Sequence, residues 1–394
     1  MITANEYTAV IEAGLEYWTE QVGRLSRVST AELSHKLDSI IYLIQCSYGW
    51  PETLPQASNL ILVVFPQAER HGWGARFIPI LEHVVKLQTN QDSPEKVRLL
   101  NRLGQLYRQQ QRYTLAVQIH KESETIAKKV DKPSLLAETH FQLSEDYLRS
   151  YNLGKAEHYG LLSQSFFEIA VGFEKWQSAI VNTLGLISFA RKQYSKSERY
   201  FRQSVSLSRQ KEEPIELART LKNLALVSQE QKNFIQAEMF YNEALSYLED
   251  NEIERCEVLN CFGALHFDQG NFELALSTFR KADAPALRYS GNIRLQTSLK
   301  HNIGLSLLRL NRFEDAIYAL EQAVTLWKQV ENFIELGRSL GKLGEAYNLV
   351  NRFEEAMLVY DEAIDIIRNY HLEKTLLKTL TQGRSAISLK LVAS

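Results

Sequence analysis

A pattern of small and aromatic residues recurs in this chain about every 40 residues, and a period of that length restricts the fold more than any other feature. The last two copies are nearly identical. NRFEDAIYALEQA spans Asn311–Ala323, and NRFEEAMLVYDEA spans Asn351–Ala363. In the last copy, Gly344 is followed nine residues later by Phe353, and Ala356 and Tyr360 then return to the same face of a helix. The period predicts a series of stacked helical hairpins.

Seven copies of the pattern align in phase. Their small residues are Gly104, Ser144, Gly185, Ala225, Gly263, Gly304 and Gly344. The residues nine positions later are Tyr113, Leu153, Tyr194, Phe234, Phe272, Phe313 and Phe353. We expect the small residue to lie where the two helices of a hairpin cross closely, and the aromatic to begin the second helix. One hairpin alone cannot bury its apolar face, so successive hairpins must stack.

Composition agrees with an all-helical chain. Only eight of the 394 residues are proline, and none occurs between Ala286 and Ser394. Leu, Ala, Glu, Gln, Lys and Arg, which favour helices, dominate these stretches. Hydrophobic residues make up 45% and charged residues 23%, as in a globular protein. No alternating β-branched segment predicts a strand of convincing length.

The small–aromatic–Ala–aromatic–Ala series resembles the tetratricopeptide repeat, a helix-turn-helix unit, from about Ser93 to Tyr370. The resemblance implies an all-α, right-handed α-solenoid of about seven to eight hairpins. The period of about 40 exceeds the usual 34 of the family, which implies longer helices, as in peptide-pheromone receptors and sensor arrays of signalling ATPases. Ser93–Pro94 reads as an N-cap followed by proline at the first helical position, and Pro133 and Pro214 are equivalent.

Three segments follow from this pattern. Residues 1–92 are predicted to form an N-terminal helical bundle that ends in a degenerate repeat, because Trp73 precedes Tyr113 by one full period. The bundle either caps the array or docks a partner. Residues 93–370 form the seven repeats, and 371–394 form a C-terminal capping helix and tail. The apolar face of that helix is outlined by Leu372, Leu376, Leu377, Leu380 and Ile387.

Motifs for chemistry are missing from the sequence. It lacks G-x-S-x-G, H-E-x-x-H, a Walker loop and an EF-hand loop, so we expect no enzyme activity, cofactor or metal. A net charge of −2 and scattered basic residues argue against nucleic acid. The apolar run Asn59–Phe65 is too short to span a membrane. Three cysteines and no basic–apolar leader predict a cytoplasmic protein.

The first helices of such hairpins line a concave surface that is suited to a protein or peptide ligand. An asparagine recurs just before the small residue, and the resemblance implies that it bonds to the backbone of a bound peptide. Apolar and basic residues share the predicted wall. The candidate set is Asn101, Asn182, Leu186, Phe189, Lys222, Asn223, Leu226, Asn260, Phe267, Asn302, Leu305, Arg309 and Lys342. Alternatively, these asparagines bond only to adjacent helical turns, and the apolar residues pack on neighbouring helices.

The leading interpretation is a non-enzymatic scaffold or regulatory adaptor that holds a peptide or helix of a partner protein in the concave groove. A second is a bacterial signal-peptide sensor that resembles pheromone receptors. A third is a sensor or adaptor subunit of a separate protease or NTPase. The sequence leaves the partner and the oligomeric state open.

Overall fold

The chain is described by a computed structural model that covers residues 4–25, 30–70, 73–88, 92–167, 169, 176–249, 251–287, 293–329, 332–370 and 374–393. It divides into two units, Met1–Glu212 and Glu213–Ser394, here called unit 1 and unit 2. Unit 1 contains α1 (Ala4–Leu25), α2 (Thr30–Cys46), the 3₁₀ turns η1 (Ser47–Gly49) and η2 (Pro51–Thr53), α3 (Leu54–Arg70), α4 (Gly74–Leu87), α5 (Pro94–Gln109), α6 (Tyr113–Val130), α7 (Pro133–Arg149), α8 (Leu153–Gln164), α9 (Gln177–Ala190) and α10 (Tyr194–Gln210).

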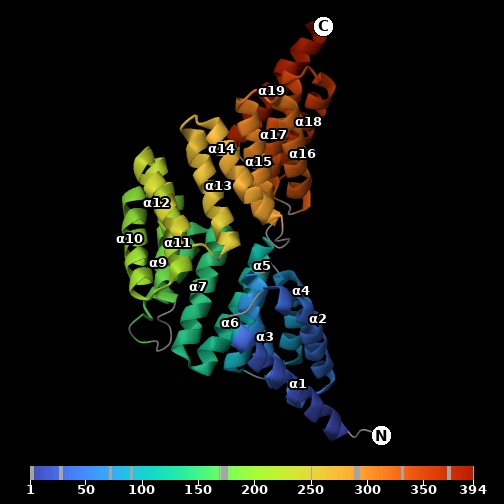
Figure 1. The fold of residues 1–394 in the computed structure, drawn as a ribbon, viewed down its shortest axis with the longest axis vertical. Helices are drawn as coiled ribbons and strands as arrows, with labels where there is room; N and C mark the ends of the chain where they lie inside the picture. The colour runs from blue at the N-terminus through green and yellow to red at the C-terminus, as the bar shows by residue number, and fades with distance from the viewer. Residues whose placement is uncertain are drawn as a thin grey trace. The chain divides into compact units, whose positions relative to one another are not determined.

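Unit 2 continues the same alternation of paired helices. It contains α11 (Pro214–Glu230), α12 (Phe234–Ser246), α13 (Glu252–Asp268), α14 (Phe272–Ala286), α15 (Ile293–Arg309), α16 (Phe313–Gln329), α17 (Phe333–Leu349), α18 (Phe353–Asn369) and α19 (Lys374–Ala393). Consecutive helices pack as antiparallel pairs, and no strand occurs in the described ranges (Figure 1). The predicted all-α solenoid is confirmed.

The repeat pattern places the helix boundaries. Each of the seven aromatic-position residues, from Tyr113 to Phe353, is the first residue of the second helix of its hairpin. Ser93 caps α5 and accepts a hydrogen bond from the Lys96 amide at 3.2 Å, with Pro94 at the first helical position. Pro133 and Pro214 hold the same position in α7 and α11. These local predictions are confirmed because fixed φ and a missing N–H suit a helix start.

All seven hairpin turns share one backbone feature. The residue two positions before the second helix has a positive φ, between 58° and 80° across the turns and near 60° in most. These residues are Gln111, Tyr151, Lys192, Lys232, Gly270, Asn311 and Asn351. The left-handed conformation favours glycine and tolerates asparagine, whereas other side chains are strained there. Only three of the seven turns therefore carry a residue that suits the turn.

Two substitutions at this turn position should change the free energy of unfolding in opposite directions. Gly270→Ala is expected to lower the free energy of unfolding by about 1 kcal/mol, because alanine is strained at a φ of 80°. Lys192→Gly is expected to raise it by about 0.5 kcal/mol, because it relieves the strain at a φ of 60°. Urea unfolding followed by circular dichroism compares the two, and equal signs would contradict the assignment of strain.

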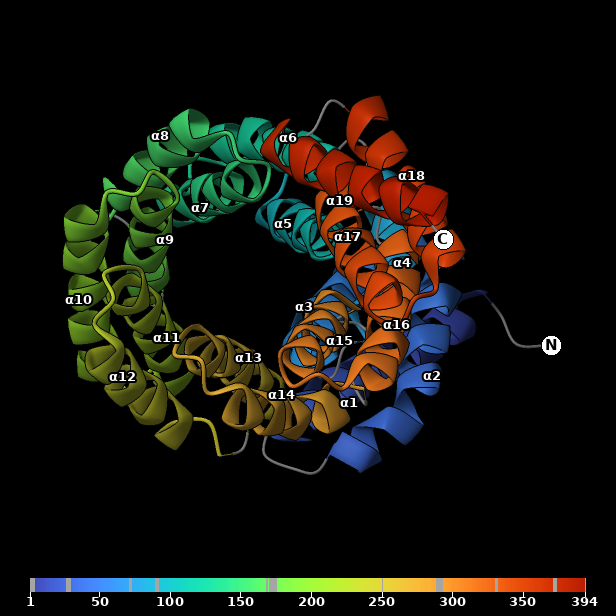
Figure 2. The same ribbon diagram turned by 90° about the horizontal axis from the view of Figure 1, so that it is seen from above.

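Each unit has an inner and an outer layer of helices. Successive first helices contact each other, α3 with α5, α5 with α7 and α7 with α9 in unit 1, and α11 with α13, α13 with α15 and α15 with α17 in unit 2. Within each unit, the second helix of a hairpin instead packs on its own first helix and on the next one. First helices therefore line the inner side of the curve within each unit (Figure 2).

Glycine and an aromatic ring form the recurring contact between the layers. A Cβ built on Gly185 would lie 2.5 Å from the Phe201 ring, and one on Gly263 would lie 2.6 Å from the Phe279 ring. Gly344 has the same relation to Tyr360. Both phenylalanine side chains are almost completely buried. The prediction that the small residue marks a close helix crossing is confirmed.

The helices at the two ends of the chain pack on their neighbours in different ways. In unit 1, α1 to α4 share one apolar core with α5 and α6. In unit 2, α19 packs on α17 and α18 through Leu380 and Ile387, while Leu372 lies outside the described residues. The segment boundaries at residues 92 and 370 stay predictions. Among the described helices, none is both long and apolar enough to cross a bilayer.

Candidate functional site

The inner wall of unit 1 is tied together by side-chain bonds between successive first helices. The Arg108 guanidinium in α5 donates to the Asp146 carboxylate of α7 at 2.7 Å and to the Gln142 side chain at 2.6 Å. Thr183 of α9 donates to Glu145 at 2.6 Å. These bonds join residues 34 to 38 positions apart, which is about one repeat. Side-chain bonds therefore connect α5 to α7 and α7 to α9 along this wall.

Asn101 belongs to this internal bonding. Its side chain is completely buried. The side-chain oxygen Oδ1 accepts from the Ser123 hydroxyl at 2.7 Å and from the Thr139 hydroxyl at 3.2 Å. The asparagine thereby joins α5, α6 and α7. A ligand cannot reach it in this structure, so Asn101 fits the alternative in which these asparagines bond to adjacent helices.

The other candidates of unit 1 lie on α9. Asn182 is 7% exposed, and Leu186 and Phe189 are half-buried. The Phe189 ring centre lies 5.8 Å from that of Tyr194, the first residue of α10. Phe189 therefore packs on its own hairpin while it keeps one edge in solvent. Leu186 and this ring are the part of the α9 set that a ligand can touch.

The remaining nine candidates all lie on the first helices of unit 2. Lys222 of α11 donates to Glu257 of α13 at 2.9 Å, and Arg219 pairs with Glu254. Burial alone would lower the pKa of Lys222, but the charges of Glu257 and Glu254 outweigh it and raise that pKa. Lys222 therefore stays charged and bound to the wall. Glu257 and Glu254 are partners that the repeat pattern did not identify.

Asparagines also link first helices in unit 2. Asn302 of α15 donates from Nδ2 to Oδ1 of Asn260 in α13 at 2.9 Å. Asn223 of α11 is 5% exposed. Gln229 donates to Asp268 at 2.7 Å one repeat further on. The amides of Asn260 and Asn302 therefore bond to each other, whereas their bonding to a peptide stays a prediction.

Apolar and basic candidates of unit 2 remain accessible between these links. Leu226 of α11, Phe267 of α13 and Leu305 of α15 are half-buried on successive helices. Arg309, the last residue of α15, is exposed and has no ion pair among the described residues. Lys342 of α17 is half-buried and pairs with Glu345 at 2.9 Å. Together with Lys222, Asn260 and Asn302, which are also half-buried, these five residues are the accessible part of the predicted groove in unit 2.

His301 is an inner-wall residue whose titration the sequence did not reveal. Its Nδ1 lies 2.8 Å from the Ser339 hydroxyl of α17. Burial lowers the pKa of the imidazole to about 4, and the positive charges of Lys342 and Arg338 act in the same direction. His301 is therefore neutral near pH 7 and joins α15 to α17.

This lowered pKa predicts a loss of stability in mild acid. An unfolded histidine binds its proton near pH 6.5, whereas folded His301 binds one only near pH 4. The unfolded state is therefore favoured as the pH falls between these values. We expect the free energy of unfolding to drop by about 2 kcal/mol more in the wild type than in His301→Gln. Urea unfolding of both proteins at pH 7.5 and pH 4 measures this difference, and parallel losses would contradict it.

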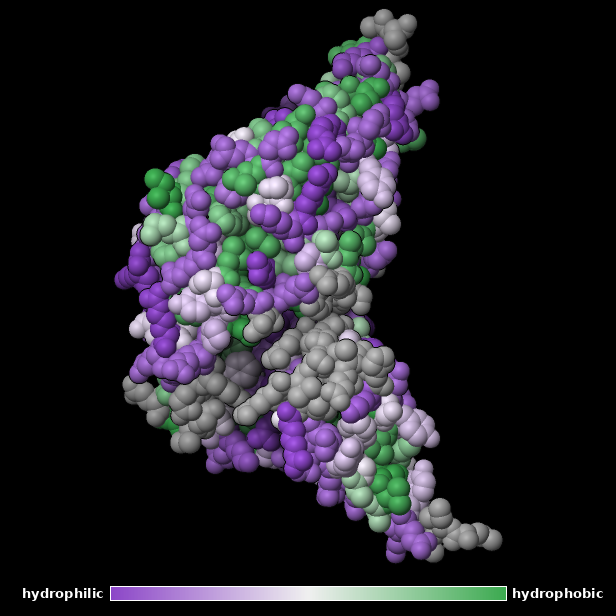
Figure 3. Space-filling model, viewed as in Figure 1, coloured by the Kyte–Doolittle hydropathy of each residue, from purple (hydrophilic) through white to green (hydrophobic). Residues whose placement is uncertain are grey.

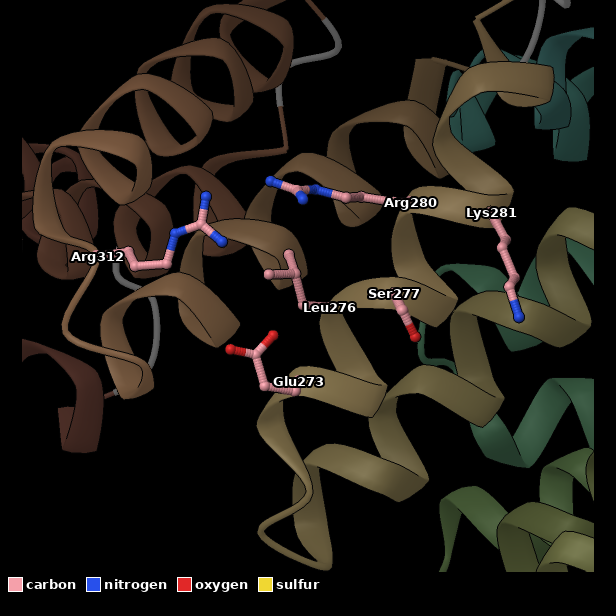
Figure 4. A pocket seen from close by; sticks show the side chains of 6 residues that line it. All are labelled: Glu273, Leu276, Ser277, Arg280, Lys281 and Arg312. Atoms are coloured by element: carbon pink, nitrogen blue, oxygen red, sulfur yellow. The ribbon is translucent and has the colours of Figure 1, made fainter.

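A shallow cleft of about 420 Å³ lies on the outer layer of unit 2. Glu273, Leu276, Ser277, Arg280 and Lys281 of α14 line it together with Arg312. Figure 4 shows Glu273, Arg280 and Arg312 turned toward Leu276, while Lys281 points away. Arg312 is held by Asp315 at 2.7 Å. Flexible charged side chains dominate this cleft, unlike the apolar pockets that bind small molecules.

Family comparisons agree with the repeat geometry. Two family models, both described as the tetratricopeptide repeat, match the chain, one at residues 177–250 and 295–369 and the other at residues 99–133. The chain is a tetratricopeptide-repeat protein. The models that match describe the repeat and no enzyme family. No curated protein sequence matches this tetratricopeptide-repeat protein.

Solved structures with the same fold extend over most of the chain. A Rap protein complexed with Competence and Sporulation Factor matches with a TM-score of 0.61 at 14% identity, over 93% of this chain and 99% of that one. The apo quorum sensor NprR from B. thuringiensis matches with 0.58 at 16%, over 91% and 99%. A signal transduction ATPase with a tetratricopeptide repeat sensor, from Pyrococcus horikoshii, matches with 0.56 at 12%, over 87% and 53%. At these identities the likeness shows the shared fold.

Proposed function

We propose that this protein is a non-enzymatic interaction protein that holds a peptide or helix of a partner protein on the inner wall of unit 2. The observation that carries the proposal is the position of Leu226, Phe267 and Leu305. They lie half-buried on three successive first helices that contact each other in turn. A protein surface exposes such a row of apolar side chains when a partner covers it.

The polar groups around this row already have partners. Lys222 is bound to Glu257, Gln229 to Asp268, and Asn302 to Asn260. A ligand that binds there loses its own conformational freedom but orders little of the protein. Exposed Arg309, at the end of α15, adds one positive charge for an acidic group of the ligand.

Peptide selection tests this proposal. Peptides of about a dozen residues are selected from a displayed random library against the full chain, and their affinities are measured by fluorescence anisotropy. Leu226→Lys combined with Leu305→Lys should weaken the selected peptides at least tenfold, because each lysine places a charge in the apolar row. Tyr318→Ser combined with Leu358→Ser, on the outer layer, is the matched control and should leave them unchanged. Equal affinity for both double variants would remove the inner wall as the site.

A short-peptide sensor is the second candidate, and the structural relatives favour it. The Rap protein is solved in complex with Competence and Sporulation Factor, NprR is a quorum sensor, and both match over 99% of their own length. In such a sensor, ligand binding changes the dimensions of the molecule. Small-angle scattering of the full chain with and without a selected peptide tests this, and unchanged dimensions at saturation would exclude it.

The cysteines bear on where this function operates. Cys46, Cys256 and Cys261 form no disulfide with one another. Because cysteines without disulfides suit a reducing compartment, we propose that the protein lies in the cytoplasm.

A further inference from the structure

The near-identity of the last two repeats extends to positions that packing does not require. The hairpin fold needs the helix-starting phenylalanine, two alanines and a large buried residue, which are Ala316, Leu320 and Ala323 in α16 and their counterparts in α18. Three outward positions are also matched. Glu314, Tyr318 and Glu321 of α16 correspond to Glu354, Leu358 and Asp361 of α18, each pair separated by one full period. Both helices therefore present an acidic, an apolar and an acidic residue in that order.

The other hairpins do not share this arrangement. At the same three positions they carry Thr114, Gln118 and Lys121; Gly154, His158 and Leu161; Ser195, Arg199 and Arg202; Ile235, Met239 and Asn242; and Glu273, Ser277 and Arg280. The fold therefore accepts acidic, basic, polar, apolar or small residues there. A carboxylate at the first of these positions suits the helix N-terminus, as with Glu273, Glu314 and Glu354, but the stability of a hairpin does not require the apolar and acidic residues that follow it in α16 and α18.

The two stripes lie side by side on the outer layer. Positions i, i+4 and i+7 share one face of a helix, and Tyr318 and Leu358 are 65% and 69% exposed. Two ion pairs connect the helices. Lys328 near the end of α16 lies 2.6 Å from Glu362 of α18, and Arg352, just before α18, lies 4.0 Å from Glu314. We call the surface formed by Glu314, Tyr318, Glu321, Glu354, Leu358 and Asp361 the outer acidic face.

The charge of this surface sets it apart from the outer layer of unit 1. Helices α16 and α18 contain eight acidic and two basic residues, whereas α6, α8 and α10 contain four acidic and eight basic ones. Some of the acids are paired, such as Asp361 with Arg384 at 2.8 Å. Glu354 and Asp365 of α18 have no hydrogen-bond or ion-pair partner among the described residues. Figure 3 shows hydrophilic and hydrophobic side chains interspersed over the visible helices of unit 2.

We propose that the outer acidic face is a second docking surface, and that it binds a segment of another protein in which apolar side chains are flanked by lysine or arginine. Tyr318 and Leu358 supply apolar contact area from two adjacent helices. The carboxylates around them attract basic side chains and repel anionic partners such as nucleic acid or an acidic membrane surface. This surface lies on the second helices, so it is separate from the inner wall assigned to the first partner and goes beyond the proposed function.

The test uses a synthetic amphipathic helical peptide of about five turns with leucines on one face and lysines on both sides of them. Its binding to the full chain is measured by fluorescence anisotropy at low and moderate salt. Tyr318→Ser combined with Leu358→Ser should weaken binding at least tenfold. Glu314→Lys combined with Glu354→Lys should weaken it as much, and should now favour a matched peptide in which glutamate replaces lysine. All four positions are exposed, so circular dichroism should show the wild-type helix content.

A charge-matched control separates a site from general attraction. Glu238→Lys combined with Glu249→Lys makes the same charge change at exposed positions in and just beyond α12. It should change the affinity less than twofold, as should the inner-wall variant Leu226→Lys with Leu305→Lys. Equal losses in the control and in Glu314→Lys/Glu354→Lys, or unchanged binding in both outer-face variants, would overturn the proposal. It would also be overturned if sedimentation showed that the wild type self-associates through Tyr318 and Leu358, because the occupant would then be a second copy.

Discussion

Gly263→Leu is expected to lower the free energy of unfolding by about 3 kcal/mol, one of the two largest effects that we predict for a single substitution. Even a Cβ at this position would lie 2.6 Å from the Phe279 ring, and the ring is 1% exposed and cannot swing into solvent. The larger leucine must push α13 away from α14. Both helices also pack on α15, so the damage spreads to the next hairpin.

Two further variants make this prediction specific. Gly154 of α8 has no atom within 4 Å of its built Cβ, so Gly154→Ala should change the stability by no more than about 0.5 kcal/mol, upward. Adding Phe279→Ala to Gly263→Leu should recover part of the loss, because the leucine side chain then fills the space that the ring leaves. Hydrogen exchange measured on α13 and α14 locates the effect within the array. A double variant that is less stable than the sum of the two single losses would contradict the steric explanation.

This contact also explains why the fold was predictable from the sequence. A glycine and the ring or other large side chain that it faces both lie within one hairpin, as with Gly185 and Phe201 or Gly344 and Tyr360. The information needed to form a hairpin is therefore local, and it is repeated seven times. The starts of the second helices followed for the same reason, since an aromatic residue at a fixed distance marks nearly every one.

The candidate site was less predictable, because its contacts join different repeats. Lys222 and Glu257 are 35 residues apart, and Asn260 and Asn302 are 42 apart, so the two pairs share no constant spacing in the sequence. Reading each repeat by itself places Lys222 on the inner wall but does not show that its charge is already bound. The same limit applies to Asn101, whose neighbours Ser123 and Thr139 come from two other helices. The pattern therefore predicts which face a residue is on, whereas the identity of the cross-repeat partner decides whether a ligand can reach it.

Asp146→Ala is the second large expected effect, with a loss of about 3–5 kcal/mol in the free energy of unfolding. The Asp146 carboxylate is completely buried and joins three helices of unit 1. It accepts from Arg108 of α5 at 2.7 Å and lies 2.5 Å from Nδ1 of His120 in α6. His120 is also completely buried. Its ring lies against Gly104, and its Nε2 lies 3.2 Å from the backbone carbonyl oxygen of Asn101. Removing the carboxylate leaves a buried imidazole nitrogen without its acceptor and takes the charged partner from the largely buried Arg108 guanidinium, which keeps only its bonds to Gln142.

A second substitution at His120 should restore part of the stability lost in Asp146→Ala, which would not happen if that variant only left a cavity in the core. It stands where Phe201 and Phe279 stand in later repeats, so phenylalanine fits against the glycine at this position without a hydrogen-bond partner. Asp146→Ala combined with His120→Phe should therefore regain stability relative to Asp146→Ala, by about 1–3 kcal/mol. The exposed ion pair Arg312–Asp315 serves as the comparison. Asp315→Ala should lower the free energy of unfolding by no more than about 1 kcal/mol. Urea unfolding of the four proteins ranks these effects. If Asp146→Ala were no more harmful than Asp315→Ala, the carboxylate would not be the group that holds α5, α6 and α7 together.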